Sequence, residues 1–321
     1  MAQRMGSAVG AARPARPSAL RVLSVSTPSC SVVKQKNSRR TGPASRADLI
    51  ANMKSAVIQI SYRVDPPVPN GAGIAGTGFL VSKDGYALTA AHVITQTKNL
   101  AQASGAKSVQ FVAGVSLDTS SVPKMNFQGS FREIPCTVVD IDEAHDIAIL
   151  KLSQNSFSPL FESGFVVGDK ELPLRAQTVR LEAELPPEGK ELLVSGYPLT
   201  VPTLVTQQGT VASLSFTSIE IERPGAPPWF KIPEVADLIF ADIVVNPGNS
   251  GGPFYLSDTG NVVGICHGNL PSPVRLQNGG IVQMQIGGSS QTLMQNSGLA
   301  IVLPIKYGIA LLDKNKISYE H

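Results

Sequence analysis

Cysteine is scarce in this chain, which has only Cys30, Cys136 and Cys266 among its 321 residues. So few cysteines without regular spacing exclude the disulfide framework that stabilises small secreted domains. Cys266 and His267 are adjacent, but neighbouring strand residues point to opposite faces, and no metal-ligand spacing surrounds them. We therefore expect Cys266 to be a buried strand residue, not a thiol nucleophile, and we expect no metal site.

Acidic residues are missing from residues 1–47, which contain nine Lys and Arg residues. An Arg- and Ser-rich, acid-poor start is typical of transit peptides, so we expect a disordered leader that directs the protein to an organelle. Pro14 and Pro17 weaken an amphipathic helix and favour a plastid over a mitochondrion. One alternative is a disordered leader without a targeting signal, and the other is that translation starts at Met53. In either case the protein would be bacterial or soluble and intracellular.

The rest of the chain lacks an excess of positive charge, because it holds 18 basic and 24 acidic residues. This balance argues against a generic basic surface for nucleic acid. Long hydrophobic runs are missing as well. Without a run of about 20 apolar residues we expect no membrane span.

Glycine and proline, by contrast, are abundant, with 29 and 24 residues. Interleaved with short apolar runs, they favour an all-β fold over a helical one. Because 42% of the residues are hydrophobic, the chain can form one large β domain with a substantial core.

The most informative segment is Asn-Pro-Gly-Asn-Ser-Gly-Gly-Pro at residues 246–253. Its serine, Ser250, is flanked by glycines, which allow positive φ angles and leave room for a substrate carbonyl to approach the backbone. This environment suits a nucleophile. An ordinary loop is the alternative, since glycine also marks turns.

Two upstream segments supply the groups that a serine nucleophile needs. Residues 76–94 predict two strands joined by a Lys-Asp-Gly turn, with His92 just past the second strand. Residues 140–152 predict an acidic turn followed by an apolar strand that starts at Asp146. A histidine can remove the serine proton near neutral pH, and a carboxylate fixes the histidine tautomer.

These segments resemble the trypsin-like serine peptidases, and most closely the HtrA/Deg branch. The matching pieces are Thr-Ala-Ala-His at residues 89–92, Asp-Ile-Ala-Ile-Leu at 146–150 and Gly-Asn-Ser-Gly-Gly-Pro at 248–253. Residues 297–305 resemble the strand that leads into the final helix of that family. The resemblance implies two six-stranded antiparallel β-barrels with a C-terminal helix.

The resemblance also sets the expected domain organisation. A protease domain is expected at residues 48–315, between the leader and a tail at 316–321. Its N-lobe would cover about 50–160 and its C-lobe about 190–315.

Within these lobes, apolar runs mark the expected strands. The strands of the first barrel are expected at residues 54–63, 76–94, 108–116 and 131–152. Those of the second barrel are expected at residues 191–197, 203–216, 238–245, 254–267 and 298–303. A terminal helix is expected at 304–313, and the Gly-, Ser- and Gln-rich residues 270–296 are expected to form a surface loop.

The resemblance assigns chemical roles to four residues. Ser250 would attack the peptide carbonyl, His92 would act first as base and then as acid, and Asp146 would orient His92. The backbone N–H groups of Gly248 and Ser250 would form the oxyanion hole. Activity should rise with pH through roughly 6 to 7.5 as the histidine loses its proton.

Other polar residues near these motifs are interpreted differently. Asp140 and Asp142 are rival carboxylates, but the sequence places them in the turn and not at the strand start. We expect His145 to be a solvated turn residue. His267 falls on the strand that lines the substrate in the family, which implies a position in the cleft wall.

The specificity pocket also follows from the resemblance. Val244, six positions before the nucleophile, would form the floor of the primary pocket, with Val245 beside it, and Gly298 would leave the pocket wall open. Burying a cation there without a partner is costly. We therefore expect cleavage after small or medium aliphatic residues.

The function implied is a serine endopeptidase that acts on unfolded or damaged protein without a cofactor. Asn249 is uncharged, so the zymogen salt bridge of the digestive enzymes is not expected. Only about 15 residues follow Ile305, fewer than a compact domain needs, so no PDZ domain is expected there. The family implies a trimer. The alternative function is a protease-fold chaperone or scaffold that binds polypeptide without hydrolysis.

Overall fold

The computed structural model divides the chain into two units, Met1–Pro43 and Ala44–His321. It describes residues 45–68, 71–117, 131–157, 166–167, 170–171, 174–200, 203–215 and 237–321, all in the second unit. Nearly all of the expected leader therefore lies outside the described residues.

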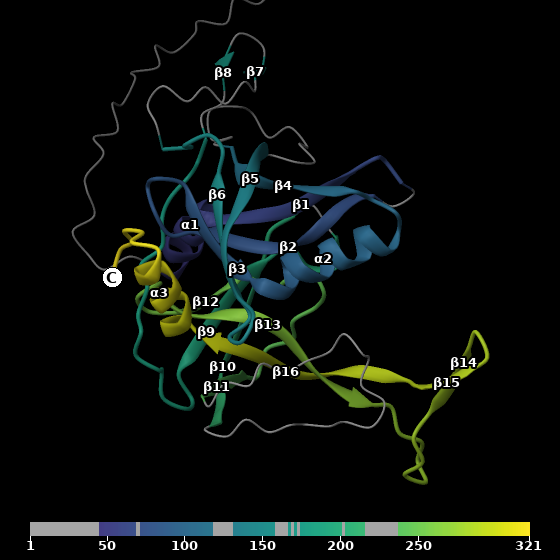
Figure 1. The fold of residues 1–321 in the computed structure, drawn as a ribbon. Helices are drawn as coiled ribbons and strands as arrows, with labels where there is room; N and C mark the ends of the chain where they lie inside the picture. Colours follow the sequence, from purple (N-terminus) through teal and green to yellow (C-terminus); the bar gives the residue numbers. More distant parts are fainter. Residues whose placement is uncertain are drawn as a thin grey trace, which may run out of the picture. The chain divides into compact units, whose positions relative to one another are not determined.

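The N-lobe of the second unit is a closed six-stranded antiparallel barrel (Figure 1). Its strands, in the order in which they pair around the barrel, are β1 (Val57–Asp65), β2 (Ala72–Leu80), β3 (Tyr86–Ala90), β6 (Ile147–Leu152), β5 (Phe131–Asp142) and β4 (Ser108–Ser116). Alternating apolar side chains fill the barrel, among them Ile58, Ile60, Leu80 and Leu150.

The C-lobe is a second closed antiparallel barrel of six strands. Its strands, in pairing order, are β10 (Val205–Ser215), β11 (Leu238–Ala241), β16 (Met294–Pro304), β13 (Val262–Pro273), β12 (Pro253–Leu256) and β9 (Glu191–Gly196). A separate apolar cluster that includes Val194, Ile239, Phe254 and Val302 fills it. The expected pair of barrels is therefore confirmed.

Within the described residues, three α-helices accompany the barrels: α1 (Arg46–Ala56), α2 (Ala91–Ala103) and α3 (Ile305–Lys314). The terminal helix was predicted, and α3 confirms it. Ile305, Leu311 and Leu312 of α3 are buried in an apolar cluster that also contains residues of both lobes. In the described residues, no helix is long and apolar enough to cross a bilayer.

Two sequence predictions are wrong at helices. Residues 54–56, expected in a strand, end α1, whose start is fixed by a capping box in which Ser45 and Asp48 bind each other's backbone N–H groups. Residues 91–94, also expected in a strand, form the first turn of α2. The apolar residues there are interrupted only by His92, and so short an apolar run does not distinguish a strand from a buried helix.

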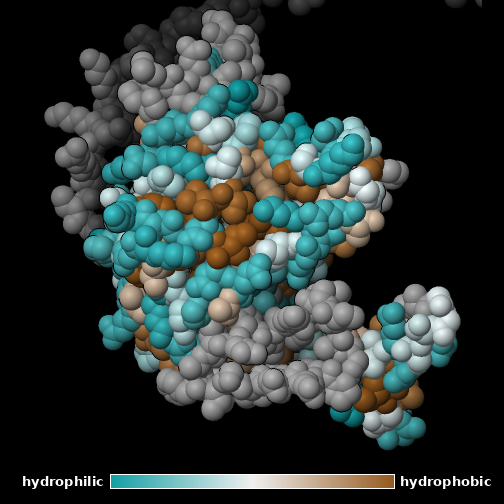
Figure 2. All heavy atoms as spheres, in the orientation of Figure 1, coloured by the Kyte–Doolittle hydropathy of each residue, from teal (hydrophilic) through white to brown (hydrophobic). Residues whose placement is uncertain are grey.

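The segment at residues 270–296 is also not the predicted loop. The outer halves of β13 and β16 pair from Asn269 to Pro273, and the hairpin of β14 (Gln283–Ile286) and β15 (Ser289–Thr292) follows. Together they form a ribbon that projects from the C-lobe barrel (Figure 1). Apolar surface is visible on this ribbon (Figure 2), and its exposed large apolar residues are Leu276, Ile281, Met284 and Leu293.

Two short strands lie between the barrels in the sequence, β7 (Val166–Val167) and β8 (Lys170–Glu171). The 3₁₀ helix η1 (Pro198–Thr200) follows β9 within the C-lobe. Residues 174–190 form isolated β-bridges and no longer strand. They are attached to both lobes: Val179 donates its backbone N–H to Leu80, and Leu181 forms a bridge with Val262.

Candidate active site

His92 and Asp146 are held together by backbone and side-chain hydrogen bonds. His92 lies in the first turn of α2, and Asp146 ends the turn before β6 with a φ of 54°. The Nδ1 of His92 lies 2.7 Å from Oδ2 of Asp146, and the backbone N–H of His92 donates to Oδ1 at 2.7 Å. The backbone N–H of Ala91 also donates to the Asp146 carbonyl. The histidine and the carboxylate are therefore locked in position.

His267 is a second histidine on the same carboxylate. It lies on β13, and its Nδ1 is 2.6 Å from Oδ2 of Asp146. The two imidazole rings meet edge to face, with centroids 5.1 Å apart. The backbone carbonyl of His267 accepts a hydrogen bond from the Oγ of Ser250 at 3.1 Å. The sequence placed His267 in the cleft wall, and its contact with Asp146 was not predicted.

Asp146 is almost completely buried, with 6% of its surface exposed. Burial by itself raises the pKa of its carboxyl group. Hydrogen bonds from His267 and His92, together with their charge, outweigh that effect and hold the pKa of Asp146 well below its usual range. Asp146 is therefore ionised at any pH at which the protein is expected to act.

The loop that carries Ser250 is shaped by two glycines with positive φ angles. Gly248 has a φ of 101° and Gly251 a φ of 82°. A Cβ atom on Gly248 would lie 2.2 Å from the carbonyl oxygen of Tyr197, so no other residue fits there without movement. The glycine at position 248 is therefore required for a steric reason.

Thr77 of β2 ties this loop to the N-lobe. Its Oγ1 donates to the Gly248 carbonyl at 2.6 Å and accepts from the backbone N–H of Tyr197 at 3.1 Å. Its own N–H donates to the Ser250 carbonyl at 2.9 Å. Sequence analysis included this threonine in a motif but did not single it out. Its position between two glycines in Gly-Thr-Gly was the available signal.

The backbone N–H groups of the loop fall into two sets. Those of Asn249, Gly251 and Gly252 donate to carbonyl oxygens within the fold. Across the described ranges, the N–H groups of Gly248 and Ser250 have no hydrogen-bond acceptor. These are the two donors that the sequence assigned to an oxyanion hole, and the structure leaves both available.

The rival polar groups have other partners. Asp140 accepts hydrogen bonds from Asn315 and pairs with Lys314, both at 2.9 Å. Asp142 lies 2.6 Å from Nδ1 of His145. His145 lies in the turn, as expected, and not on Asp146. It is less solvated than expected, because its ring is partly buried and stacks on Tyr307 of α3 with centroids 4.1 Å apart.

The residues proposed for the specificity pocket have different environments. Val244 is 49% exposed, whereas Val245 is fully buried in the C-lobe core. Gly298 has a φ of 86°, and a Cβ atom placed there would meet nothing within 4 Å. The space beside Gly298 is therefore open, and the role of Val244 as the pocket floor stays a prediction.

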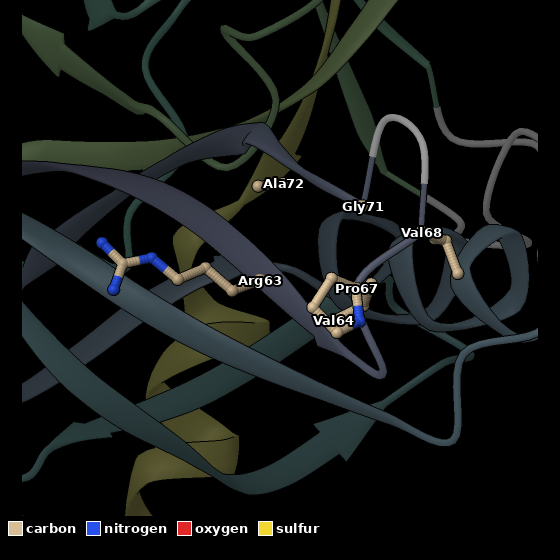
Figure 3. Close-up of a pocket in the computed structure, with 6 residues that line it drawn as sticks. All are labelled: Arg63, Val64, Pro67, Val68, Gly71 and Ala72. Atoms are coloured by element: carbon tan, nitrogen blue, oxygen red, sulfur yellow. The ribbon is translucent and has the colours of Figure 1, made fainter.

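A shallow pocket at the end of the β1–β2 hairpin is a separate feature (Figure 3). It is lined by Arg63, Val64, Pro67, Val68, Gly71 and Ala72. Its one charged side chain, Arg63, pairs with Glu133. The pocket contains no nucleophile and no base, so it does not compete with the site around Asp146.

The groups of His92, Asp146 and His267 could in principle hold a metal ion, because their ligand atoms lie within 4.8 Å of one another. Ligand atoms on a tetrahedral zinc ion lie roughly 3.3 Å apart when each bond is about 2.0 Å long. Here both Nδ1 atoms lie at hydrogen-bond distance from one carboxylate oxygen. The geometry fits a hydrogen-bonded cluster better than a metal centre.

Comparison with known proteins places the chain in a family. The model of the trypsin-like peptidase domain matches residues 76–265, which include His92, Asp146 and Ser250. The chain is 28% identical to the serine protease HTRA1 of Xenopus laevis over 224 residues, which cover 68% of this chain and 37% of that protein. It is 28% identical to the probable periplasmic serine endoprotease DegP-like of Halomonas elongata, with 59% of this chain and 28% of that protein covered.

The chain thus spans about a third of the length of the curated relatives it matches. Among solved structures, a variant of the HtrA-type protease AlgW with a decapeptide matches 84% of this chain and 66% of its own, with a TM-score of 0.50 and 18% identity. That likeness concerns the fold. Because the family match covers more than half of the sequence, the chain belongs to the trypsin-like peptidase domain family.

Proposed function

We propose that the protein is a serine endopeptidase in which His92, Asp146 and Ser250 form the catalytic triad. The observation that carries the proposal is the bond between His92 Nδ1 and Asp146 Oδ2, made rigid by the second bond from the His92 backbone N–H. It sets the tautomer in which Nε2 of His92 can accept a proton. The names of the relatives, which are serine proteases, point to the same activity.

The reaction would proceed through an acyl-enzyme. The hydroxyl proton of Ser250, which now points to the His267 carbonyl, would change acceptor to His92 as Oγ attacks the peptide carbonyl. The N–H groups of Gly248 and Ser250 would bind the resulting oxyanion. Protonated His92 would then give its proton to the leaving amine, and water would hydrolyse the ester by the reverse sequence.

The substrate class that we propose is unfolded or damaged polypeptide, cleaved after small or medium aliphatic residues. Support for the pocket comes from the open space beside Gly298 and from the absence of a charged group at Val244 and Val245. A homotrimer, a role in protein quality control and a transit peptide within residues 1–47 belong to the same proposal. They rest on the resemblance and on composition alone.

A fluorophosphonate probe tests the activity directly. Ser250→Ala and His92→Ala should each lose labelling and casein cleavage by several orders of magnitude, because triad residues act as a unit. Ser290→Ala, which removes an exposed serine of the β14–β15 hairpin, is the matched control and should behave as wild type. Both active-site variants should keep the circular dichroism spectrum of the folded chain.

Either of two results would contradict the proposal. Near-wild-type cleavage by Ser250→Ala would place the nucleophile elsewhere. A folded wild-type chain that never labels, alone or as an oligomer, would favour the alternative of a protease-fold chaperone or scaffold that binds polypeptide without hydrolysis.

A further inference from the structure

We propose that Gln207 and Asn296 are positioning residues that clamp residues 242–249 from two sides, so that the primary pocket is formed before a substrate binds. These residues, which we call the pocket segment, run from the end of β11 to the residue before Ser250 and include Val244. The inference rests on the proposed function, because the pocket and the nucleophile belong to that proposal. It adds two residues to which the sequence analysis gave no role.

The pocket segment begins where β11 loses both of its neighbouring strands. β11 lies between β10 and β16 in the C-lobe barrel. Its last residue, Ala241, pairs with Val211 on one side and with Ala300 on the other. Residues 243–246 belong to no strand. The regular ladder therefore stops before the chain reaches the nucleophile loop.

Two side-chain amides take the place of the missing backbone partners. Nε2 of Gln207, on β10, donates to the carbonyl of Val244 at 2.5 Å. Nδ2 of Asn296, on β16, donates to the carbonyl of Val245 at 2.6 Å. In the part of the chain that the structure describes, neither carbonyl accepts a backbone N–H. Because β10 and β16 flank β11 on opposite sides, the two amides hold the pocket segment from both sides.

Each amide also binds a second group through its oxygen. Oε1 of Gln207 accepts a hydrogen bond from Nδ2 of Asn249 at 3.4 Å. Oδ1 of Asn296 accepts from the backbone N–H of Gly298 at 2.9 Å. Asn249 is almost completely buried, with 1% of its surface exposed, and directly precedes Ser250. Gln207 therefore connects the proposed pocket floor to the nucleophile loop, and Asn296 connects it to the pocket wall.

The bond from Asn296 also explains how the space beside Gly298 is bounded. The ladder between β11 and β16 ends at the pair of Ala241 and Ala300. Val245 and Asn296 lie four residues beyond that pair on their respective segments. Between these two points a Cβ atom on Gly298 would meet nothing within 4 Å. The open space therefore has the last ladder pair at one end and the side-chain bond to Val245 at the other.

A neutral clamp suits a segment in which Asn249 carries no charge. A salt bridge holds a loop only while both partners are ionised, whereas a side-chain amide does not titrate. Without the amides the pocket segment would adopt other conformations, and a substrate would bind only those molecules in which the pocket is formed. The apparent affinity falls by that fraction, while the bound enzyme reacts at the same rate. The clamp should therefore act on KM and not on kcat.

Substitutions of similar size remove the amides. Gln207→Met and Asn296→Leu are made singly and together. Gln208→Met is the matched control, because Gln208 is the next residue of β10 and its amide binds Glu191 and Arg46. For each variant, kcat, KM and the pH profile are measured on a peptide with valine before the scissile bond. Labelling by the fluorophosphonate probe and circular dichroism are recorded in parallel.

We expect each single variant to raise KM roughly 3- to 10-fold, the range for losing a neutral hydrogen bond, and the double variant roughly 10- to 100-fold. In all three, kcat should change by less than about twofold, and the pH profile should stay that of the wild type. Gln208→Met should keep the wild-type KM.

A measurement on the wild type tests the same bonds without a substitution. In ¹⁵N-labelled protein, the side-chain amide hydrogens of Gln207 and Asn296 should exchange with water more slowly than those of Gln295, an exposed residue of β16. Hydrogen bonding of the first two amides is the reason for the expected difference.

The outcomes distinguish this inference from the proposed function. Wild-type protein that never labels with the probe contradicts the proposed function itself. If the wild type labels, an unchanged KM in folded Gln207→Met and Asn296→Leu overturns the clamp alone. A loss confined to kcat, or an equal rise of KM in Gln208→Met, overturns it as well. If no variant folds, equal exchange rates for the amides of Gln207, Asn296 and Gln295 in the wild type overturn it.

Discussion

At the residue scale, the hydroxyl of Thr77 holds the loop of Ser250 in place through two hydrogen bonds. It is fully buried and bridges two backbone groups, the Gly248 carbonyl and the Tyr197 N–H. Both groups belong to segments that shape the oxyanion donors. A buried backbone group without a hydrogen-bond partner costs free energy. The Thr77 hydroxyl avoids this cost at two groups, the Gly248 carbonyl and the Tyr197 N–H.

Thr77→Val keeps the shape of the side chain and removes the hydroxyl. We expect the free energy of unfolding to fall by about 1–3 kcal/mol and kcat to fall roughly tenfold or more as the loop loosens. The control is Thr97→Val in α2, which loses one buried hydroxyl bonded within its own helix, to Val93. It should lower stability in urea unfolding while leaving kcat unchanged. Equal loss of kcat in both variants would contradict the role of Thr77.

The sequence was sufficient to select Asp146 as the partner of His92 from three nearby aspartates. Asp146 was chosen because it was expected at a strand start, with Asp140 and Asp142 in the turn. The structure instead places Asp140 and Asp142 at the end of β5 and Asp146 in the turn before β6. Of the three carboxylates, Asp146 is the one that lies on His92. The contact between His267 and Asp146 was not predictable in the same way. These residues are 121 positions apart and meet only because two barrels pack together. A single sequence contains no local signal of such a contact.

At the scale of elements, the ribbon formed by the outer parts of β13 and β16 with β14 and β15 is independent of the barrels. The barrel order closes without β14 and β15, which pair only with each other. The links from this hairpin to the rest of the ribbon run through Val274, Val282 and Leu293. Its removal should therefore leave the C-lobe core unchanged.

Excising residues 283–292, so that Val282 is joined to Leu293, tests this independence. We expect the thermal midpoint to change by less than roughly 2 °C, because few buried contacts are lost. Differential scanning calorimetry measures the change, with the full chain as reference. A loss of cooperative unfolding would show that the ribbon is part of the folding core.

The fold was largely predictable at this scale, and the two main errors in its prediction have different causes. Short apolar runs bounded by turn residues predicted the barrel strands, and the structure confirms both barrels and α3. The start of α2 was missed because Ala90, Ala91, Val93 and Ile94 are all buried, which removes the periodicity that reveals a helix. The ribbon was missed because its glycines suggested loops, although Gly287 and Gly288 only turn a hairpin.

At the scale of the whole molecule, the charge of Asp146 contributes to stability as well as to chemistry. Its pKa is lower in the folded chain than the unfolded value of about 3.9. A group of this kind stabilises the fold at pH values above its unfolded pKa, and that contribution is lost as the pH falls toward the folded pKa. The pH window for the loss therefore lies below about pH 4.

Comparison of wild type with Asp146→Asn at about pH 5 and about pH 3 tests this linkage, because these values lie on either side of the ordinary pKa of an aspartate. The wild type should be more stable in urea unfolding at the higher pH, and the difference between the two proteins should shrink at the lower one. Ionisation of all other carboxylates is common to both proteins and cancels. A difference that stays constant or grows toward pH 3 would contradict the lowered pKa.

Each barrel closes on its own, yet the proposed triad is divided between them, with His92 and Asp146 on one and Ser250 on the other. The connection between β6 and β9 contacts both lobes, at Leu80 and at Val262. In addition, hydrogen bonds from His267 and Thr77 cross directly from one lobe to the other and hold these groups together. On the proposed function, a chain cut once in that connection would regain peptidase activity only when its two fragments reassociate.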